Sequence, residues 1–438
     1  MIEPVRSFSA ELAVIGSGMA GFAASVFAVN RGIATALTGN SGAMAYTTGY
    51  LDLLGRVDGS TLSAADPWLA LADLRSTQPH HPLSRIAAAD IRNGFDEFTR
   101  FLGESGLAYS RAGEHNLTAL TPAGTLKHTL CMPATMLAGP RALAERTACT
   151  VVAFEGLKGF SAREVVANLG SRWPGLVAQR IAFPDMGRGE VYAEVMARAL
   201  EVPATREKLA AVLKGVAGQA RVIGLPAILG MHRPDRVHAE LQRLTGLEIF
   251  EIPTMPPSVP GVRLRELLEQ ALPKTGVTLI PQHKVAQLCF DAEGASLDLH
   301  DSFGAIRIRA RAVILATGRF LSGGLEAQPH GIREPLLDLP VTQPAGRAEW
   351  YRERYTDERG HAIHRAGIEV DDESRPLGRD GRRCSERLFA AGVILAHQDW
   401  IRSRSGAGIA IASAYKAVEA AARYLRPAST GPSSQGCA

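Results

Sequence analysis

The stretch ELAVIGSGMAG, residues 11–21, decides the predicted fold. An apolar run with strand character leads directly into three glycines at the spacing GxGxxG, and a helix-like stretch, residues 22–31, follows. A second β-rich run comes at residues 33–37. A strand, a helix and a second strand within about 30 residues form the βαβ unit that binds dinucleotides. The sequence therefore predicts a Rossmann-like α/β domain with a parallel sheet.

Each glycine of this fingerprint has a physical task. The first permits a tight turn, the second lets a phosphate approach the backbone, and the third lets the helix pack on the strand. The positive N-terminal end of the helix then provides an anion site. We expect cofactor phosphates to lie against the residues of this turn, which are Gly16, Ser17, Gly18, Met19, Ala20 and Gly21.

The residues after the second strand depart from the pattern of a nicotinamide-binding domain. Thr38 stands where an Asp or Glu commonly holds a ribose hydroxyl. The next stretch, residues 39–52, is rich in small and hydroxyl residues, among them Ser41, Gly42 and Gly49. Such a stretch suits a backbone that runs beside a flat ligand, so we expect cofactor contacts at Thr38, Ser41, Gly42 and Gly49, although an ordinary surface turn has the same composition.

Two further glycine-containing strand ends occur late in the chain. AVILATG, residues 312–318, is an apolar run of the kind found in the middle of a parallel sheet, and LFAAG, residues 388–392, repeats the arrangement. A last long helix then begins near residue 409, and its N-terminus is another anion site. We expect cofactor contacts at Thr317, Gly318, Gly392, Gly406, Ala407 and Gly408.

The composition excludes several classes of function. The formal net charge of +4 is small for 438 residues, so no nucleic-acid partner is expected. No apolar run approaches the ~20 residues of a membrane helix, and the N-terminal segment lacks the apolar core of a signal peptide, so we expect a cytoplasmic chain. The five cysteines form no CxxC pair, and no metal or iron–sulfur site is predicted.

The three glycine-containing elements, in this order, together resemble the two-domain flavoprotein oxidoreductases. Six segments show a more specific likeness: GYLDLL at 49–54, PAGTL at 122–126, PTMPPSVPGVR at 253–263, GRFLSGGL at 318–325, GIREP at 331–335 and GRAEWY at 346–351. These segments resemble the B subunit of anaerobic glycerol-3-phosphate dehydrogenase, and the resemblance runs over nearly the whole chain.

The resemblance implies a function and partners. It implies oxidation of sn-glycerol 3-phosphate to dihydroxyacetone phosphate, with electrons passed to membrane quinone during anaerobic growth. It further implies a flavin, described as FMN for this member of the complex. The implied partners are a catalytic A subunit and, as membrane anchor, an iron–sulfur C subunit. The chain is accordingly expected at the inner face of the cell membrane, held there through these partners.

The sequence pattern also predicts a domain organisation. The expected fold class is α/β, with a Rossmann-like flavin-binding domain, its parallel sheet, and an inserted α/β domain. The block at residues 150–255 alternates strands and helices without a phosphate-binding glycine loop, so we interpret it as part of a domain that covers a site. The predicted boundaries are 8–65 and 266–426 for the flavin-binding domain, 66–265 for the inserted substrate or cap domain, and 427–438 for a disordered tail.

The sequence departs from the wider flavoprotein pattern in its nucleotide contacts. Thr38 offers no carboxylate for an adenosine ribose, which favours FMN, with FAD as the alternative. Val393 follows Gly392 where an Asp commonly contacts the ribityl chain, and the start of the last helix has fewer glycines than the pattern leads one to expect.

Oxidation of a phosphorylated secondary alcohol needs a hydride acceptor, a base and a cationic clamp. We expect the clamp to be Arg333, with Arg263 and Arg319 as further candidates, because each lies in a family-like segment rich in Gly or Pro. His364 or His361 is the expected base. Surface or ion-paired arginines and ordinary histidines are the competing interpretation.

A different role for the chain also fits the sequence. The sparse supply of obvious bases suits a flavin-bearing electron relay or a structural component, with the alcohol chemistry done in the A subunit. A fumarate-reductase-like or amino-acid-oxidising flavoenzyme would apply if the likeness to the B subunit were superficial.

Overall fold

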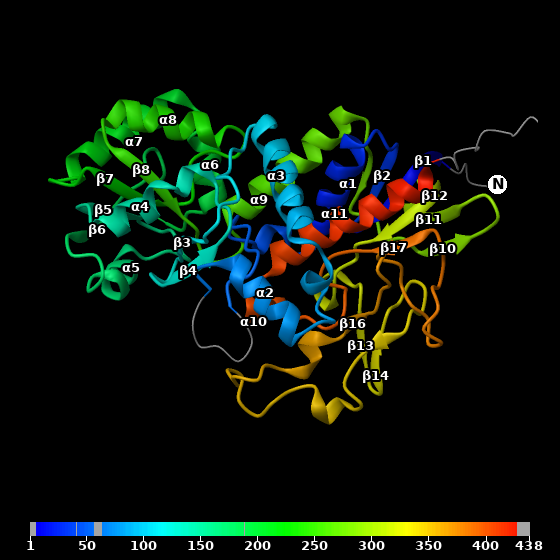
Figure 1. The fold of residues 1–438 in the computed structure, drawn as a ribbon. Coiled ribbons are helices and arrows are strands. Elements are labelled where there is room, and N and C mark those ends of the chain that lie inside the picture. Colours follow the sequence, from blue (N-terminus) through cyan, green and yellow to red (C-terminus); the bar gives the residue numbers. More distant parts are fainter. Residues whose placement is uncertain (1–5, 41, 57–63, 188, 427–438) are drawn as a thin grey trace, which may run out of the picture.

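The computed structural model describes residues 6–40, 42–56, 64–187 and 189–426 (Figure 1). The predicted disordered tail at 427–438 lies outside the described residues. Two larger sheets, one mixed and one wholly parallel, are each packed with helices and form two units that lie beside one another. This arrangement confirms the predicted α/β fold class.

The larger sheet has a parallel centre and an antiparallel edge. Its parallel strands lie side by side in the order β9 (Thr278–Pro281), β2 (Thr35–Gly39), β1 (Arg6–Ile15), β12 (Gly304–Leu315) and β17 (Leu388–Ala390). The antiparallel strands β10 (Gln287–Phe290) and β11 (Ala295–Asp301) extend the sheet from the first half of β12. Because the central strands are parallel, their carboxyl ends meet at one edge of the sheet.

Both faces of this sheet are buried. In β1, Leu12 and Val14 pack into one apolar cluster, whereas Ala13 and Ile15 pack into another on the opposite face. This alternation follows from the two-residue period of a strand, and it explains why the run reads as continuously apolar.

The first cluster contains three long helices. These are α1 (Met19–Asn30), α3 (Ala88–Glu104) and α11 (Gly406–Leu425), which Figure 1 shows crossing one face of the sheet. The Phe27 ring packs edge-on against Phe98 and Tyr415, with ring centroids 6.5 and 5.3 Å apart. The opposite face is covered by the irregular segment after β12, through residues such as Trp350 and Ile363.

The second unit is also built on parallel strands. Their order is β6 (Leu176–Ile181), β5 (Cys149–Phe154), β7 (Val222–Pro226) and β8 (Glu248–Ile252). Its helices are α4 (Ala138–Glu145), α5 (Ala162–Leu169), α6 (Ala193–Ala199), α7 (Pro203–Val216) and α8 (Pro234–Thr245). A hairpin of β3 (Leu117–Leu120) and β4 (Leu126–Thr129) connects this unit to the first, since the Tyr50 hydroxyl donates to the Leu120 carbonyl at 2.7 Å.

The predicted insertion, 66–265, contains more than this second unit. Helix α2 (Pro67–Thr77) begins at Pro67, where Asp66 accepts from two backbone N–H groups, and Leu71 packs in the same apolar cluster as α1 and α11. The apolar face of α3 lies in that cluster too, as does part of α9 (Val259–Ala271). Burial therefore assigns these helices to the core of the first unit.

The described chain also contains shorter elements. They include η1 (Met44–Tyr46), β13 (Glu326–Gln328), β14 (Gly331–Arg333), β15 (Val341–Thr342), β16 (Gly367–Ile368) and α10 (Trp400–Ser403). Within the described ranges, no helix has the length and apolarity that crossing a bilayer requires. The same residues contain no group of three or more His, Cys, Asp or Glu side chains placed to hold a metal ion.

A buried ion pair fastens α9 to β8. Both nitrogens of the Arg263 fork lie 2.7 Å from the Glu251 carboxylate, and Arg263 Nε donates to the Gly230 carbonyl at 2.6 Å. Thr135 Oγ1 and the Leu229 N–H donate to the same carboxylate. Because its fork is fully used in this way and the residue does not line the cavity described below, Arg263 lacks the geometry of the substrate clamp predicted from sequence.

We expect Arg263→Ala to lower the free energy of unfolding by about 3–5 kcal/mol, because it leaves Glu251 buried without its cation. Urea unfolding measures the difference. The control is Arg236→Ala, which removes an exposed partner of Glu240 and should cost less than about 1 kcal/mol. Equal losses in the two variants would contradict the structural role of the pair.

The pH dependence of the free energy of unfolding provides a second test of the Arg263–Glu251 pair. Burial favours the neutral acid, but the Arg263 guanidinium and the donated hydrogen bonds together lower the pKa of Glu251. A lowered pKa contributes stability above the unfolded value, about 4.3 for Glu, and that contribution is lost as the pH falls through the native value. Without the guanidinium, burial raises the pKa of Glu251 in the variant, so the stability gap between wild type and Arg263→Ala should shrink as the pH falls towards and below about 4.3.

Candidate functional site

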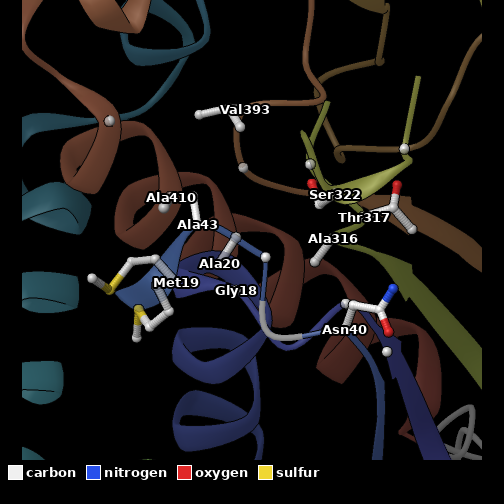
Figure 2. Close-up of a pocket in the computed structure, with 18 of the residues that line it drawn as sticks. Gly18, Met19, Ala20, Asn40, Ala43, Ala316, Thr317, Ser322, Val393 and Ala410 are labelled. Carbon is white, nitrogen blue, oxygen red and sulfur yellow. The ribbon is translucent and has the colours of Figure 1, made fainter. Parts of the chain in front are cut away.

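A cavity of about 750 Å³ lies along the carboxyl edge of the larger sheet. The residues that follow each parallel strand line it, and Figure 2 shows several of them around one hollow. They include Lys284 after β9, Asn40 after β2, Gly18 after β1, Thr317 after β12 and Val393 after β17. Open α/β sheets bind ligands at this edge, and the volume is within the usual range for a cofactor site.

Close backbone contacts at Gly16 shape the middle of the cavity. A Cβ on Gly16 would lie 2.3 Å from the Ala316 carbonyl oxygen, and one on Gly21 would lie 1.6 Å from the Gly16 oxygen. A Cβ on Gly39 would lie 2.7 Å from Gly16 Cα. Gly16 and Gly39 also have φ angles of +114° and +131°, which L-residues rarely adopt. Only glycine fits at these points, where β1, α1, β2 and β12 meet.

Gly18 has a different task from its neighbours. A Cβ there would meet nothing within 4 Å, and its φ of −86° is ordinary for any residue. Gly18 is the N-cap of α1 and has no side chain to accept from the first-turn N–H groups, while Met19 and Ala20 line the cavity. Uncapped N–H groups at the positive end of a helix form a site for a phosphate.

A second helix begins at one end of the cavity. Gly406 and Ala407, in the first turn of α11, line it, and the Gly408 N–H donates to the Asp52 carbonyl at 2.7 Å. The N-cap, Ser405, contacts Ser403 Oγ at 2.7 Å instead of capping the helix. The positive end of this 20-residue helix therefore favours negative charge on whatever lies beside it.

The hydroxyl of Thr317 also points to a bound group. Thr317 Oγ1 is buried and has no hydrogen-bond partner among the described residues. Buried hydroxyls are nearly always paired in folded proteins, so a ligand atom at this position would satisfy it. Together with the uncapped start of α1, this orphan fits a phosphorylated cofactor such as a flavin nucleotide.

Most of the cofactor contacts predicted from sequence line this cavity. They are Gly16, Gly18, Met19, Ala20, Gly42, Thr317, Gly318, Gly392, Gly406 and Ala407. Their contact with a cofactor stays a prediction, although the structure brings them together.

Other predicted contacts have structural tasks. Ser17 donates to the Gly39 carbonyl at 2.7 Å, and Thr38 Oγ1 donates to the His283 carbonyl at 3.3 Å. Gly21 packs under Gly16, Gly49 O accepts from the Tyr109 hydroxyl, and Gly408 lies against the backbone of residues 52–53. Ser41 lies outside the described residues.

None of the predicted arginine clamps lines the cavity. Arg333 is half exposed on β14, where its Nε lies 2.9 Å from Asp338 Oδ1. Arg319 is buried and donates to the Ile363 and His364 carbonyls, and burial lowers its pKa to about 10. Neither guanidinium lines the cavity, so their roles in binding a substrate phosphate stay predictions without support from this geometry.

The two predicted bases are held by other contacts. His361 Nδ1 accepts from the Arg352 N–H at 3.0 Å, and His361 Nε2 lies 2.9 Å from the Tyr355 carbonyl. His364 Nδ1 lies 3.3 Å from Asp399 Oδ2. Neither ring lines the cavity, and the assignment of a base to this stretch stays a prediction.

The charged residues that do line the cavity were not chosen from sequence. Within the described residues they are Asp52, Lys127, Lys284, Glu334 and Arg404. Glu334 has a structural task, because its carboxylate accepts from the backbone N–H groups of residues 336 and 337. A signal existed for two of the others, since Asp52 lies in GYLDLL and Lys127 directly follows PAGTL.

Comparison with known proteins identifies the relatives of this chain. A family described as an FAD binding domain matches residues 11–409. The B subunit of anaerobic glycerol-3-phosphate dehydrogenase from Vibrio cholerae serotype O1 is 30% identical over 424 residues, covering 93% of this chain and 95% of that protein. The corresponding protein of Vibrio vulnificus is 29% identical over 433 residues, covering 94% and 96%.

Among solved structures, 3-ketosteroid Δ1-dehydrogenase from Sterolibacterium denitrificans aligns with a TM-score of 0.43 and 11% identity. The alignment covers 95% of this chain and 100% of that one. A similarity of this size supports no conclusion about the site.

The open space at Gly18 gives a sharp test of the phosphate site. We expect Gly18→Val to fold with near wild-type stability but to bind little or no flavin, because the added side chain would occupy the space in front of the α1 N-terminus. Flavin absorbance per chain and thermal unfolding measure the two effects together. A stable variant that keeps its flavin would contradict the assignment.

Gly21→Val is the matched contrast on the same helix. Its Cβ would lie 1.6 Å from the Gly16 oxygen, so we expect this variant to misfold rather than to lose flavin alone.

Proposed function

This chain belongs to the family of the B subunit of anaerobic glycerol-3-phosphate dehydrogenase, and we propose that it binds a flavin and oxidises sn-glycerol 3-phosphate to dihydroxyacetone phosphate. The B-subunit relative and the FAD binding domain match confirm the family predicted from the sequence segments. The observation that supports the activity is the cavity itself, which is lined by the first turns of both α1 and α11 and by Lys127 and Arg404.

The residues of the chain would bind and orient the cofactor. The uncapped first turn of α1 would hold its phosphate, and the close backbone approach at Gly16 leaves that turn unobstructed. The first turn of α11, Gly406 and Ala407, would stabilise negative charge that develops on the ring. A bound flavin supplies the hydride acceptor that alcohol oxidation requires.

We propose FAD as the cofactor, in place of the FMN that Thr38 favoured. The side chain of Thr38 is turned to His283 and is not part of the cavity, so its lack of a carboxylate says little about a ribose. The cavity extends past β2 to the segment after β9, where Lys284, Val285 and Ala286 line it. Strand β9 is two places from β1 in the sheet, which is a distance of about 10 Å. A nucleotide on that side of the phosphate would have Asn40 as a polar neighbour.

We also propose that the chain works in a complex. The relatives are named as subunits, which supports a multi-subunit enzyme. The A and C subunits would then attach the chain to the membrane and lead electrons to quinone.

We expect the isolated, flavin-loaded chain to be bleached anaerobically by sn-glycerol 3-phosphate, because the proposed substrate and hydride acceptor sites share one cavity. Absorbance during titration measures the bleaching, and glycerol without a phosphate is the control. Bleaching that occurs only after the A subunit is added would contradict the proposal and favour the electron-relay role.

The cofactor released from the folded chain by mild acid should contain adenine. Chromatography against FMN and FAD standards measures this. Release of FMN alone would contradict the proposal that the β2 and β9 side of the cavity holds an adenosine.

A further inference from the structure

We propose that Lys127 and Arg404 form the anion-binding end of the cavity and hold the phosphate of the substrate, with Asp52 positioning Lys127. The inference rests on the proposed oxidation of glycerol 3-phosphate for the identity of the ligand. Its chemistry is more general, because the same end would bind any small phosphate monoester.

Lys127 reaches the cavity from the β3–β4 hairpin. Its Nζ lies 2.6 Å from Asp52 Oδ2, and the two side chains are 18% and 13% exposed. The second carboxylate oxygen, Asp52 Oδ1, is buried and has no partner among the described residues. Asp52 therefore fixes the position of the ammonium group from one side, and the ammonium retains hydrogen-bond donors for a ligand.

Arg404 approaches the same end from the turn between α10 and α11. It is exposed, it lines the cavity, and no ion pair within the described residues includes it. Its backbone has φ +50° and ψ +56°, a left-handed conformation that a residue with a side chain adopts at a cost.

The helix end adds a third positive contribution. The first turn of α11 follows Arg404 directly, and its Gly408 N–H is hydrogen-bonded to the Asp52 carbonyl. Two cations and a helix N-terminus of about half a positive charge outweigh the single carboxyl group, so this end is net positive. A phosphate monoester, which has a charge of about −1.5 to −2 at pH 7, complements it.

The other cation of the cavity does not share this environment. Lys284 follows β9, at the opposite edge of the parallel strands from the residues that follow β17, and its nearest acid is Glu326 at 4.0 Å. The arginine fork and the lysine ammonium at the α11 end together suit a tetrahedral anion better, because the fork donates two parallel hydrogen bonds and the ammonium acts as a point charge.

The first test is Arg404→Gly in the flavin-loaded full chain. The backbone at this position suits glycine, so the variant should fold with its flavin retained. We expect the dissociation constants of inorganic phosphate and of sn-glycerol 3-phosphate to rise about tenfold or more, measured by perturbation of the flavin spectrum.

The chain offers a matched control for this substitution. Arg146 is also an exposed helix C-cap, with φ +53° and ψ +36°, at the end of α4 and outside the cavity. Arg146→Gly removes the same charge from the same backbone conformation. It should leave both dissociation constants unchanged.

The second test addresses Lys127. Lys127→Gln is made together with Asp52→Asn, so that no buried carboxylate is left without its cation. We expect this double variant to weaken phosphate binding about tenfold with unchanged flavin content, and Asp52→Asn alone to weaken it less. Lys127→Arg should restore part of the affinity, because it keeps the charge.

The outcomes separate this inference from the proposed function. If phosphate binding depends on Arg404 and Lys127 but glycerol 3-phosphate never bleaches the flavin, the anion site stands and the proposed reaction falls. If glycerol 3-phosphate bleaches the flavin while both variants bind phosphate like wild type, the anion site is overturned. Loss of flavin in both variants would also overturn it, since these cations would then hold the cofactor.

Discussion

The crowding of backbone around Gly16 is the constraint on which the rest of the structure depends. At this point the end of β1, the start of α1, the end of β2 and the residue after β12 approach within distances that leave no room for a Cβ. The approach aligns the carboxyl ends of the parallel strands, and the N-cap Gly18 leaves the first N–H groups of α1 without a capping side chain. A helix N-terminus left open in this way suits the phosphate of the proposed cofactor.

The cavity that results has two chemically different ends. The side of β2 and β9 offers Asn40 and the backbone after β9, which suit a nucleotide. The side of α11 offers a helix N-terminus with Lys127, Asp52 and Arg404. Lys127 comes from the hairpin that joins the two units, so the proposed substrate end combines residues from both sides of that junction.

The sequence predicted the fold class and the glycine-rich turns well, because their physics is local. The spacing of Gly16, Gly18 and Gly21 decides a turn and a helix start within a few residues, and the apolar strand ends are equally local signals. The domain boundary was harder to predict, since α2 and α3 follow the first strands in sequence but bury their apolar faces against α1 and α11.

The charged end of the cavity could not be assembled from sequence alone. Asp52, Lys127 and Arg404 come from three distant segments, and only tertiary packing brings them together. Conversely, Arg263 and Arg319 looked available for a ligand because a sequence does not show that a guanidinium is already paired inside the fold. Glycine-rich or proline-rich surroundings identify loops, but they do not say which loops face the same cavity.

A crystal structure of the flavin-loaded chain tests the central claim most directly, namely that one cavity orients the cofactor between the two helix N-termini. We expect the phosphates at the first turn of α1, the ring beside Gly406 and Ala407, and the adenosine half toward Lys284. A ring found on the side of β9, or a flavin bound outside the cavity, would contradict the claim.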